Sequence, residues 1–178
     1  MIPVFLANGF EEIEALAAVD LLRRAGVEVV TVGVGTKVPV GAHNIAVCAD
    51  IGEDELNVKA IDGVVLPGGM PGTTNLEASA VVQSAIAYAA ERGMLLAAIC
   101  AAPSILGHGG YLCEKNATCY PGFESELTGA ILGRGVVVDG NIITASGAGV
   151  AVDFALELVR YLVSDEVALA IRGGIQCL

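Results

Sequence analysis

The feature that most constrains this chain is a strand-to-helix turn at Cys100. Residues 95–99 form a continuous apolar run typical of a buried parallel strand, and Pro103 fits the first turn of a helix. Enzymes of the α/β class present a nucleophile at such a sharp turn, where the positions two before and two after need small side chains. Those positions hold Ala98 and Ala102. We expect the helix N-terminus to favour the thiolate of Cys100; the alternative is a core cysteine at the end of a buried strand.

Similar apolar runs alternate with helical patterns along the whole chain. They predict parallel core strands and intervening helices, with mostly parallel strands in one sheet covered by helices on both faces. The strands are expected at residues 2–7, 27–33, 63–66 and 95–99, the helices at about 11–25, 78–92 and 150–163 with a short helical tail, and hairpins within 38–49 and around Asp139-Gly140. No linker or repeat divides the sequence, so a single α/β domain is predicted over residues 1–178.

Four loops that follow predicted strands are expected to converge on one rim of this sheet. They contain Asn8-Gly9, Gly68-Gly69, Cys100 and Ser146-Gly147. Ligands of such sheets bind beyond the carboxyl ends of the strands, and glycine allows backbone N–H groups to approach a ligand closely. Ordinary turn chemistry explains any one of these glycines, whereas the convergence of four loops predicts a binding site.

A nucleophilic cysteine needs a group that takes or holds its proton. The two histidines are His43, in the expected turn at residues 41–44, and His108, in a glycine-rich loop that predicts a solvent-exposed turn residue. A Cys-His-Glu triad therefore stays open without positive support. Glu14 is the other candidate, since it lies one turn into the first helix beside apolar residues. Desolvation would raise its pKa and keep it protonated near neutral pH, and it would titrate with Cys100 as a coupled pair.

Charge and cysteine content narrow the class of protein. Twenty acidic and nine basic residues give a net charge of −11, which repels phosphate backbones and argues against nucleic-acid binding. The first residues lack the basic start of a signal peptide, and no apolar stretch is long enough to span a membrane. Five cysteines form no C-x-x-C pair, so we expect a soluble protein of the reducing cytoplasm. Cys48 is expected to be a small buried residue. No metal site is predicted, because the spacing of histidines and cysteines matches no usual pattern.

Several motifs together resemble the ThiJ/PfpI superfamily, and within it the DJ-one branch. They lie in family order and cover essentially the whole chain: NGFEEIE at residues 8–14, LRRAG at 22–26, VVLPGG at 64–69, AAICAAP at 97–103 and SGAG at 146–149. The resemblance implies one domain like those of class I glutamine amidotransferases, folded as a flavodoxin-like three-layer sandwich. It also implies a homodimer and an activity that needs no cofactor.

The resemblance also implies roles for individual residues. Cys100 would be the reactive, oxidisable cysteine and Glu14 its protonated partner, while Gly68, Gly69 and Ala101 would supply backbone N–H groups to an oxyanion. Further residues would line the site: Asn8, Gly9, Arg24, His43, Tyr120, Ser146 and Gly147.

Among the expected site residues, one position matches the family pattern and two depart from it. Arg24 matches an arginine near the dimer contact and the site. Tyr120 stands before a proline where several members have histidine, and Ala101 stands where the peptidase-like branch has histidine directly after the nucleophile. Whether His43 or Tyr120 takes the place of a family base stays open. Peptidase or amidase activity therefore ranks behind the other functions.

The resemblance suggests two main functions that share these residues. One is an enzyme that acts on small reactive aldehydes, as a glyoxalase converting methylglyoxal to lactate or as a deglycase of early glycation adducts on amines and thiols. The other is an oxidative-stress sensor or chaperone that uses the oxidation of Cys100. Turnover separates them, because a sensor reacts stoichiometrically.

Overall fold

A seven-stranded sheet organises the structure, a computed structural model that describes residues 1–177. The strand order is β3-β2-β1-β4-β5-β9-β8, and neighbouring strands are parallel except for the antiparallel pair β8–β9. The strands are β1 (Ile2–Ala7), β2 (Val29–Val34), β3 (Ile51–Gly52), β4 (Gly63–Leu66), β5 (Leu95–Ile99), β8 (Val136–Asp139) and β9 (Ile142–Ala145). The chain order reverses between β1 and β4, which in doubly wound sheets marks where ligands bind.

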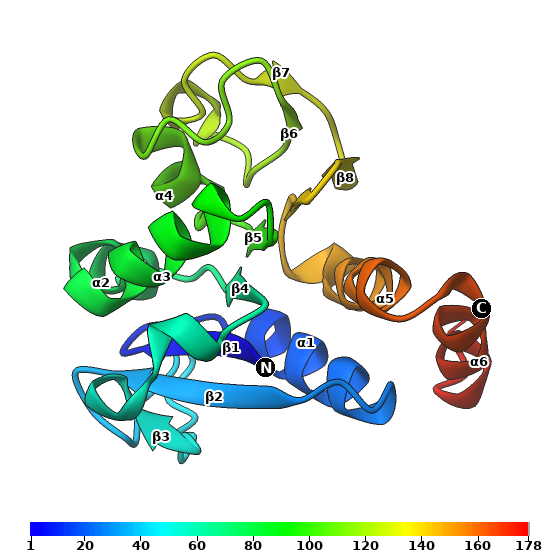
Figure 1. The fold of residues 1–178 in the computed structure, drawn as a ribbon, viewed down its shortest axis with the longest axis horizontal. Coiled ribbons are helices and arrows are strands. Elements are labelled where there is room, and N and C mark those ends of the chain that lie inside the picture. The colour runs from blue at the N-terminus through cyan, green and yellow to red at the C-terminus, as the bar shows by residue number, and fades with distance from the viewer. Residues whose placement is uncertain (178) are drawn as a thin grey trace.

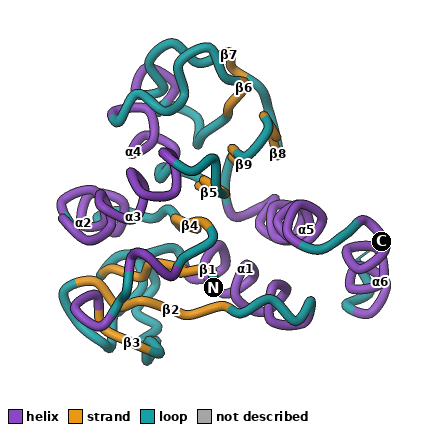
Figure 2. Tube along the Cα trace, viewed as in Figure 1, coloured by secondary structure: helices purple, strands orange, loops and turns teal. Residues whose placement is uncertain are grey.

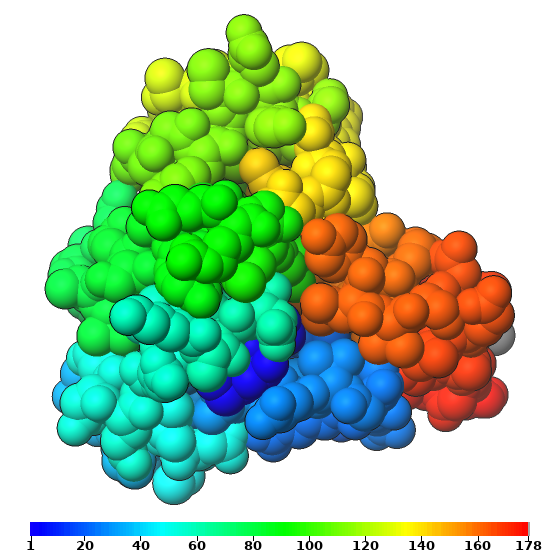
Figure 3. Space-filling view, viewed as in Figure 1, coloured from blue at the N-terminus to red at the C-terminus, as the bar shows by residue number. Residues whose placement is uncertain are grey.

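Helices cover both faces of this sheet (Figure 1). Helices α1 (Glu12–Arg24) and α5 (Ala151–Leu162) share one apolar core with the sheet, whereas α2 (Gly72–Ala78), α3 (Ala80–Glu91) and α4 (Pro103–His108) share the core on the other face. Helix α6 (Asp165–Gly174) packs against α5 and extends the molecule to one side (Figure 3). The expected flavodoxin-like three-layer sandwich is confirmed. Within residues 1–177, no helix combines the length and the apolar character needed to cross a bilayer.

The central strands follow directly from their continuous apolar sequences. The predicted bounds of β1, β4 and β5 coincide with those observed, and every residue of these three strands is buried. A strand buried on both faces needs apolar side chains at successive positions, since both faces meet helices. These strands fix the rim formed by their carboxyl ends, because they form the middle of the sheet.

Toward its edges the structure departs from the expectation or adds to it. The helix expected at 78–92 is α3, and a separate helix that was not predicted, α2, precedes it; Ser79 between them is extended and caps α3 by accepting the Val82 N–H. The small hairpin expected within 38–49 is present in outline, with an antiparallel bridge between Val40 and Ala46 and backbone hydrogen bonds from Val47 to Pro39 and from Ala49 to Lys37; its Val40 also hydrogen-bonds to residues 8 and 9. The segment from 109 to 135 is mostly loop (Figure 2) and pairs two short strands, β6 (Asn116–Ala117) and β7 (Ile131–Leu132).

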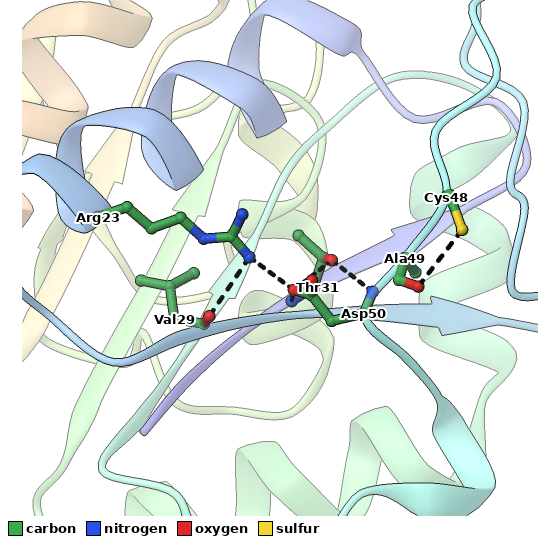
Figure 4. A network of polar contacts seen from close by, with 6 residues as sticks. All are labelled: Arg23, Val29, Thr31, Cys48, Ala49 and Asp50. Atoms are coloured by element: carbon green, nitrogen blue, oxygen red, sulfur yellow. Dashed lines mark hydrogen bonds and ion pairs between the residues drawn. The ribbon is translucent and has the colours of Figure 1, made fainter.

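Cys48 is exposed, so the expectation of a buried residue is wrong. It lies at the edge of a polar network, in which Asp50 accepts hydrogen bonds from Arg23 and from the backbone and hydroxyl of Thr31 (Figure 4). This network ties the end of α1 to β2 and the loop before β3. Within this segment Ala49 is buried and Val47 packs against the core, whereas Cys48 between them is exposed.

Candidate active site

Cys100 occupies the sharp turn that its sequence predicts. It follows β5 and donates its backbone N–H to the carbonyl of Ala145, 2.8 Å away, while α4 begins three residues later at Pro103. Its φ of +65° lies in the left-handed region, which is rare for a residue with a side chain. Strained backbone of this kind gathers at functional sites, and here it aims the sulfur away from the direction of the strand.

Glu14 is buried beneath this turn, as its position on α1 predicts. Only 1% of the residue is exposed. Its Oε2 accepts the N–H of Gly68 at 2.9 Å, whereas the buried Oε1 has no hydrogen-bond partner within residues 1–177. Burial raises the pKa of Glu14 from its usual value to about 7, against the lowering effect of Cys100 and Gly68. Near neutral pH, Oε1 can therefore hold a proton or take one.

The Cys100 thiol is not the thiolate that the helix N-terminus predicts. Its pKa is raised from the ordinary value to about 12. Burial is the larger cause, and the neighbouring carboxyl of Glu14 adds to it. The N–H groups of Gly69 and Ala101 act in the opposite direction, but α4 has only six residues and contributes a small dipole. Near neutral pH the thiol therefore keeps its proton while Glu14 is partly protonated, and an unprotonated Glu14 is the group placed to accept the thiol proton.

The two glycines after β4 have different roles. Gly68 lies between the reactive groups, where an added Cβ would be 2.6 Å from the Cβ of Cys100 and 2.8 Å from Oε2 of Glu14. Because its N–H is already bonded to Glu14, it does not serve as the oxyanion donor that we expected. Gly69, with a φ of +88°, and Ala101 are the donors whose N–H groups face the sulfur.

Asn8 and Gly9 build the rim instead of lining the reactive centre. The side-chain oxygen of Asn8 accepts the N–H of Val40, and its carbonyl accepts the side-chain amide of Asn75. Gly9, with a φ of +87°, packs so closely on Pro71 that an added Cβ would lie 2.5 Å from its ring. Together they lock the loop after β1 to the start of α2 and to the 38–46 segment.

Tyr120 lies next to Cys100, and Gly147 lies against the ring of Tyr120. The Tyr120 N–H donates to the carbonyl of Cys100 at 2.7 Å, and a Cβ added to Gly147 would meet the Tyr120 ring at 3.3 Å. Ser146 follows β9 and lines a cavity of about 580 Å³ beside this turn. Ala148, which we did not single out, directs its backbone at Glu14; it belongs to the same glycine-rich motif, and only the fold shows where its N–H points.

Arg24 and His43 lie away from the Cys100 sulfur within this chain. Arg24 is at the far end of α1, ten residues or about 15 Å along the helix from Glu14, and pairs with Asp20 at 2.7 Å. His43 is largely exposed, and its Nδ1 is 3.0 Å from Glu12 and 3.4 Å from Glu11. A role for Arg24 at the site would need a second copy of the chain and stays a prediction.

His108 is exposed at the end of α4, as its glycine-rich surroundings predict, and it bridges two carboxylates. Its Nδ1 lies 2.6 Å from Glu77 and its Nε2 lies 2.8 Å from Glu126. Both ring nitrogens are therefore occupied away from Cys100, which removes His108 from any catalytic triad. These two contacts raise the pKa of His108 above its ordinary value of 6.5, and the contact with Glu126 has the larger effect.

The stability of the protein should therefore depend on pH through His108. A pKa raised on folding contributes stability below pH 6.5, and this contribution is lost as the pH rises through the folded-state value. We expect His108→Gln to lower the free energy of unfolding at pH 6 by no more than about 1 kcal/mol, because half-exposed pairs are screened, and to lower it less at pH 9. Urea unfolding of both proteins at the two pH values measures this difference. An equal loss at both values would contradict it.

The fold and this site define a class: α/β proteins with a flavodoxin-like sheet, in which a cysteine at a strand-to-helix turn lies beside a buried glutamate. The description of the DJ-1/PfpI family matches residues 1–161. The chain is 34% identical over 176 residues to Protein dj-1beta of Drosophila melanogaster, covering 97% of this chain and 94% of that protein. It is 35% identical over 176 residues to the Parkinson disease protein 7 homolog of Danio rerio, with 96% and 93% covered. The chain belongs to the DJ-1/PfpI family.

Two further relatives differ from these, one in its length and one in having a name that states an activity. Protein DJ-1 homolog B of Arabidopsis thaliana is 36% identical over 178 residues, 97% of this chain but only 40% of that protein. The Caenorhabditis elegans glutathione-independent glyoxalase DJR-1.2 is 31% identical over 159 residues, covering 88% of this chain and 84% of the worm protein. Among solved structures, oxidized Toxoplasma gondii DJ-1 superposes with a TM-score of 0.94 at 34% identity, covering 98% of this chain and 97% of that one.

Proposed function

We propose that this protein is a cysteine-dependent glyoxalase that converts methylglyoxal-type aldehydes to 2-hydroxy acids without a cofactor. The observation that carries the proposal is the buried carboxyl of Glu14, whose pKa is raised to about 7 beside the Cys100 thiol. An acid–base group acts best when its pKa lies near the working pH. The similarity to a worm glutathione-independent glyoxalase supports the same activity.

The reaction divides into steps that these residues can perform. The Cys100 sulfur attacks the aldehyde carbon as Glu14 takes the thiol proton, and the oxygen of the resulting hemithioacetal lies at the N–H groups of Gly69 and Ala101. A proton then moves from the former aldehyde carbon to the neighbouring ketone carbon, with Glu14 as acid and base. This leaves a thioester, and its hydrolysis by water releases the 2-hydroxy acid and restores the thiol. Overall, methylglyoxal and one water give lactate.

The same first step extends the proposal to early glycation adducts. A hemithioacetal or aminocarbinol releases its aldehyde, and Cys100 captures the released carbonyl for conversion to the hydroxy acid. The protein would then act as a deglycase by removing the aldehyde from its equilibrium with amines and thiols. This activity uses no residue beyond those already named.

A redox sensor is the second candidate function. The N–H groups that face Cys100 would also stabilise a negatively charged sulfenate or sulfinate, and a protonated Glu14 would donate to it. The similar Toxoplasma gondii protein has been solved in an oxidized form. In the sensor, each protein would react once with peroxide and not turn over.

The test is to incubate the pure protein with methylglyoxal, without glutathione, and to quantify lactate against time. Lactate matters more than loss of aldehyde, because any exposed thiol traps an aldehyde reversibly. Many lactate molecules per protein would support the glyoxalase. Lactate at the background level would contradict it and favour the sensor, for which the mass of Cys100 after mild peroxide is the next measurement.

The pH dependence of this reaction should follow Glu14. Because its carboxyl must be unprotonated to take the thiol proton, kcat/KM should rise as the pH increases through about 7. Glu14→Gln keeps an oxygen for the Gly68 N–H but cannot accept a proton, and we expect kcat/KM to fall by about a hundredfold or more and to lose this rise. Initial rates of lactate formation from pH 5 to 9 measure both effects. Glu12→Gln, the same change on the same helix, should keep the rise; a rise that persists in Glu14→Gln would contradict the assignment.

A further inference from the structure

The cavity of about 580 Å³ beside Cys100 has no part in the mechanism above. Its wall includes Cys119, which precedes Tyr120, and Ser146, which follows Ala145. The Tyr120 N–H donates to the carbonyl of Cys100, and Ala145 accepts the N–H of Cys100. The cavity wall therefore begins one residue from two groups that are bonded to the reactive cysteine, although Cys100 itself does not line it. The cavity therefore adjoins the backbone of Cys100.

Arg134 brings a positive charge to this cavity and is not ion-paired within the described residues. Five of the six arginines lie within 4 Å of a carboxylate, whereas Arg134 forms no ion pair and no hydrogen bond within residues 1–177. The hydroxyl of Ser146, on the same wall, also has no hydrogen-bond partner there. In a chain with a net charge of −11, an arginine without a carboxylate partner is exceptional. A guanidinium and a hydroxyl together suit a carboxylate, which accepts hydrogen bonds from both.

Glu124 is the one acidic group on the cavity wall, and it opposes this charge. Its Oε2 accepts the N–H of Gly122 at 2.7 Å, which holds the carboxylate in its own turn and leaves the guanidinium of Arg134 unpaired. Glu124 therefore lowers the preference for anions without abolishing it. Arg134 and Glu124 therefore place two opposite charges on one cavity wall, and each can be substituted separately.

We propose that this cavity selects α-oxoaldehydes that carry a carboxylate, which is held by Arg134 and Ser146 while the aldehyde carbon reaches Cys100. This inference rests on the proposed function, because it names the substrate class of the same site. The overall negative charge of the protein repels anions, so the local charge of Arg134 is what admits them. The aldehyde and the carboxylate would be separated by a short chain that passes Tyr120.

Two five-carbon substrates that differ in charge test the selection. The anionic substrate is 4,5-dioxopentanoate, which isomerises with one water to 2-hydroxypentanedioate, and the neutral one is 2-oxopentanal, which gives 2-hydroxypentanoate. We expect the wild type to prefer the anion and the ratio of the two kcat/KM values to fall about tenfold in Arg134→Gln, as for one charge-assisted hydrogen bond. Arg134→Lys should keep most of the ratio, Glu124→Gln should raise it, and Arg92→Gln, at an exposed arginine on another face, should leave it unchanged.

A second pair of probes keeps the inference testable without turnover. The rates at which 3-maleimidopropanoate and N-ethylmaleimide modify Cys100, followed by mass spectrometry of its peptide, should show the same dependence on Arg134. If neither aldehyde is turned over, the glyoxalase proposal fails and the maleimide ratio alone decides the inference. If both are turned over and Arg134→Gln leaves their ratio unchanged, or if the wild type prefers the neutral aldehyde, the inference is overturned and the glyoxalase stands.

Discussion

Replacing Cys100 by serine is expected to lower the rate of lactate formation from methylglyoxal by at least about a thousandfold. Serine has nearly the same size and the same backbone requirements, so the strained turn at φ +65° is kept. Its hydroxyl is far less acidic than a thiol, however, and Glu14 with a pKa of about 7 is too weak a base to activate it. The measurement is lactate per protein against time at pH 7.5, together with thermal melting to show that the fold is retained.

The control for this substitution is Cys113→Ser. Cys113 is an exposed free thiol that can trap aldehydes but has no buried glutamate beside it. The Cys113→Ser variant should therefore form lactate at the unchanged rate while showing less reversible loss of aldehyde. Lactate formation that survives in Cys100→Ser would reject the covalent mechanism and leave the activity to another group.

Gly68→Ala is expected to remove activity and to destabilise the protein by about 3 kcal/mol or more. The added methyl group would lie 2.6 Å from the Cβ of Cys100, 2.8 Å from Glu14 and 2.9 Å from the carbonyl of Ile99. Only the Glu14 oxygen ends a flexible side chain, and it is buried and bonded to the Gly68 N–H, so the methyl group must push Cys100 and Glu14 apart. Gly68 has no positive φ, and the cost is therefore steric and not conformational. Urea unfolding and the lactate assay measure the two effects.

Gly173→Ala provides the matched control for this clash. Gly173 lies in α6, where an added Cβ meets nothing within 4 Å, so alanine should stabilise the protein by up to about 1 kcal/mol. If Gly68→Ala were as stable and as active as the wild type, the close packing between the loop after β4 and Cys100 would be wrong.

The fold could be predicted in its centre and less well toward its edges. The strands β1, β4 and β5 are recognisable because burial on both faces requires unbroken apolar sequence. Helix α2 escapes prediction since its seven residues include two threonines and an asparagine, which are poor helix formers, and its position depends on packing against β1. The hairpin of residues 38–49 follows from its β-prone residues and central turn, whereas its hydrogen bonds to the loop after β1 are revealed by no local pattern.

The same division applies to the site. The burial of Glu14 could be predicted because its place in the first turn of α1 sets it above the sheet rim. The protonation state of Cys100 could not, since it depends on how deeply the turn is buried and on the distance to a carboxyl that is distant in sequence. Likewise, both glycines after β4 look alike as donors. Only the hydrogen bond from Gly68 to Glu14 shows that one of them is already engaged.

The groups that hold the reactive sulfur belong mainly to the backbone, and this limits how such a protein can evolve. The N–H groups of Gly69 and Ala101, which face the sulfur, persist whatever side chain these positions carry, so mutation can disable them only by crowding them. A new substrate preference can therefore arise from changes in the cavity wall, at positions such as Arg134 and Ser146, while the reactive centre is inherited intact. One scaffold can in this way acquire different substrates without passing through an inactive ancestor.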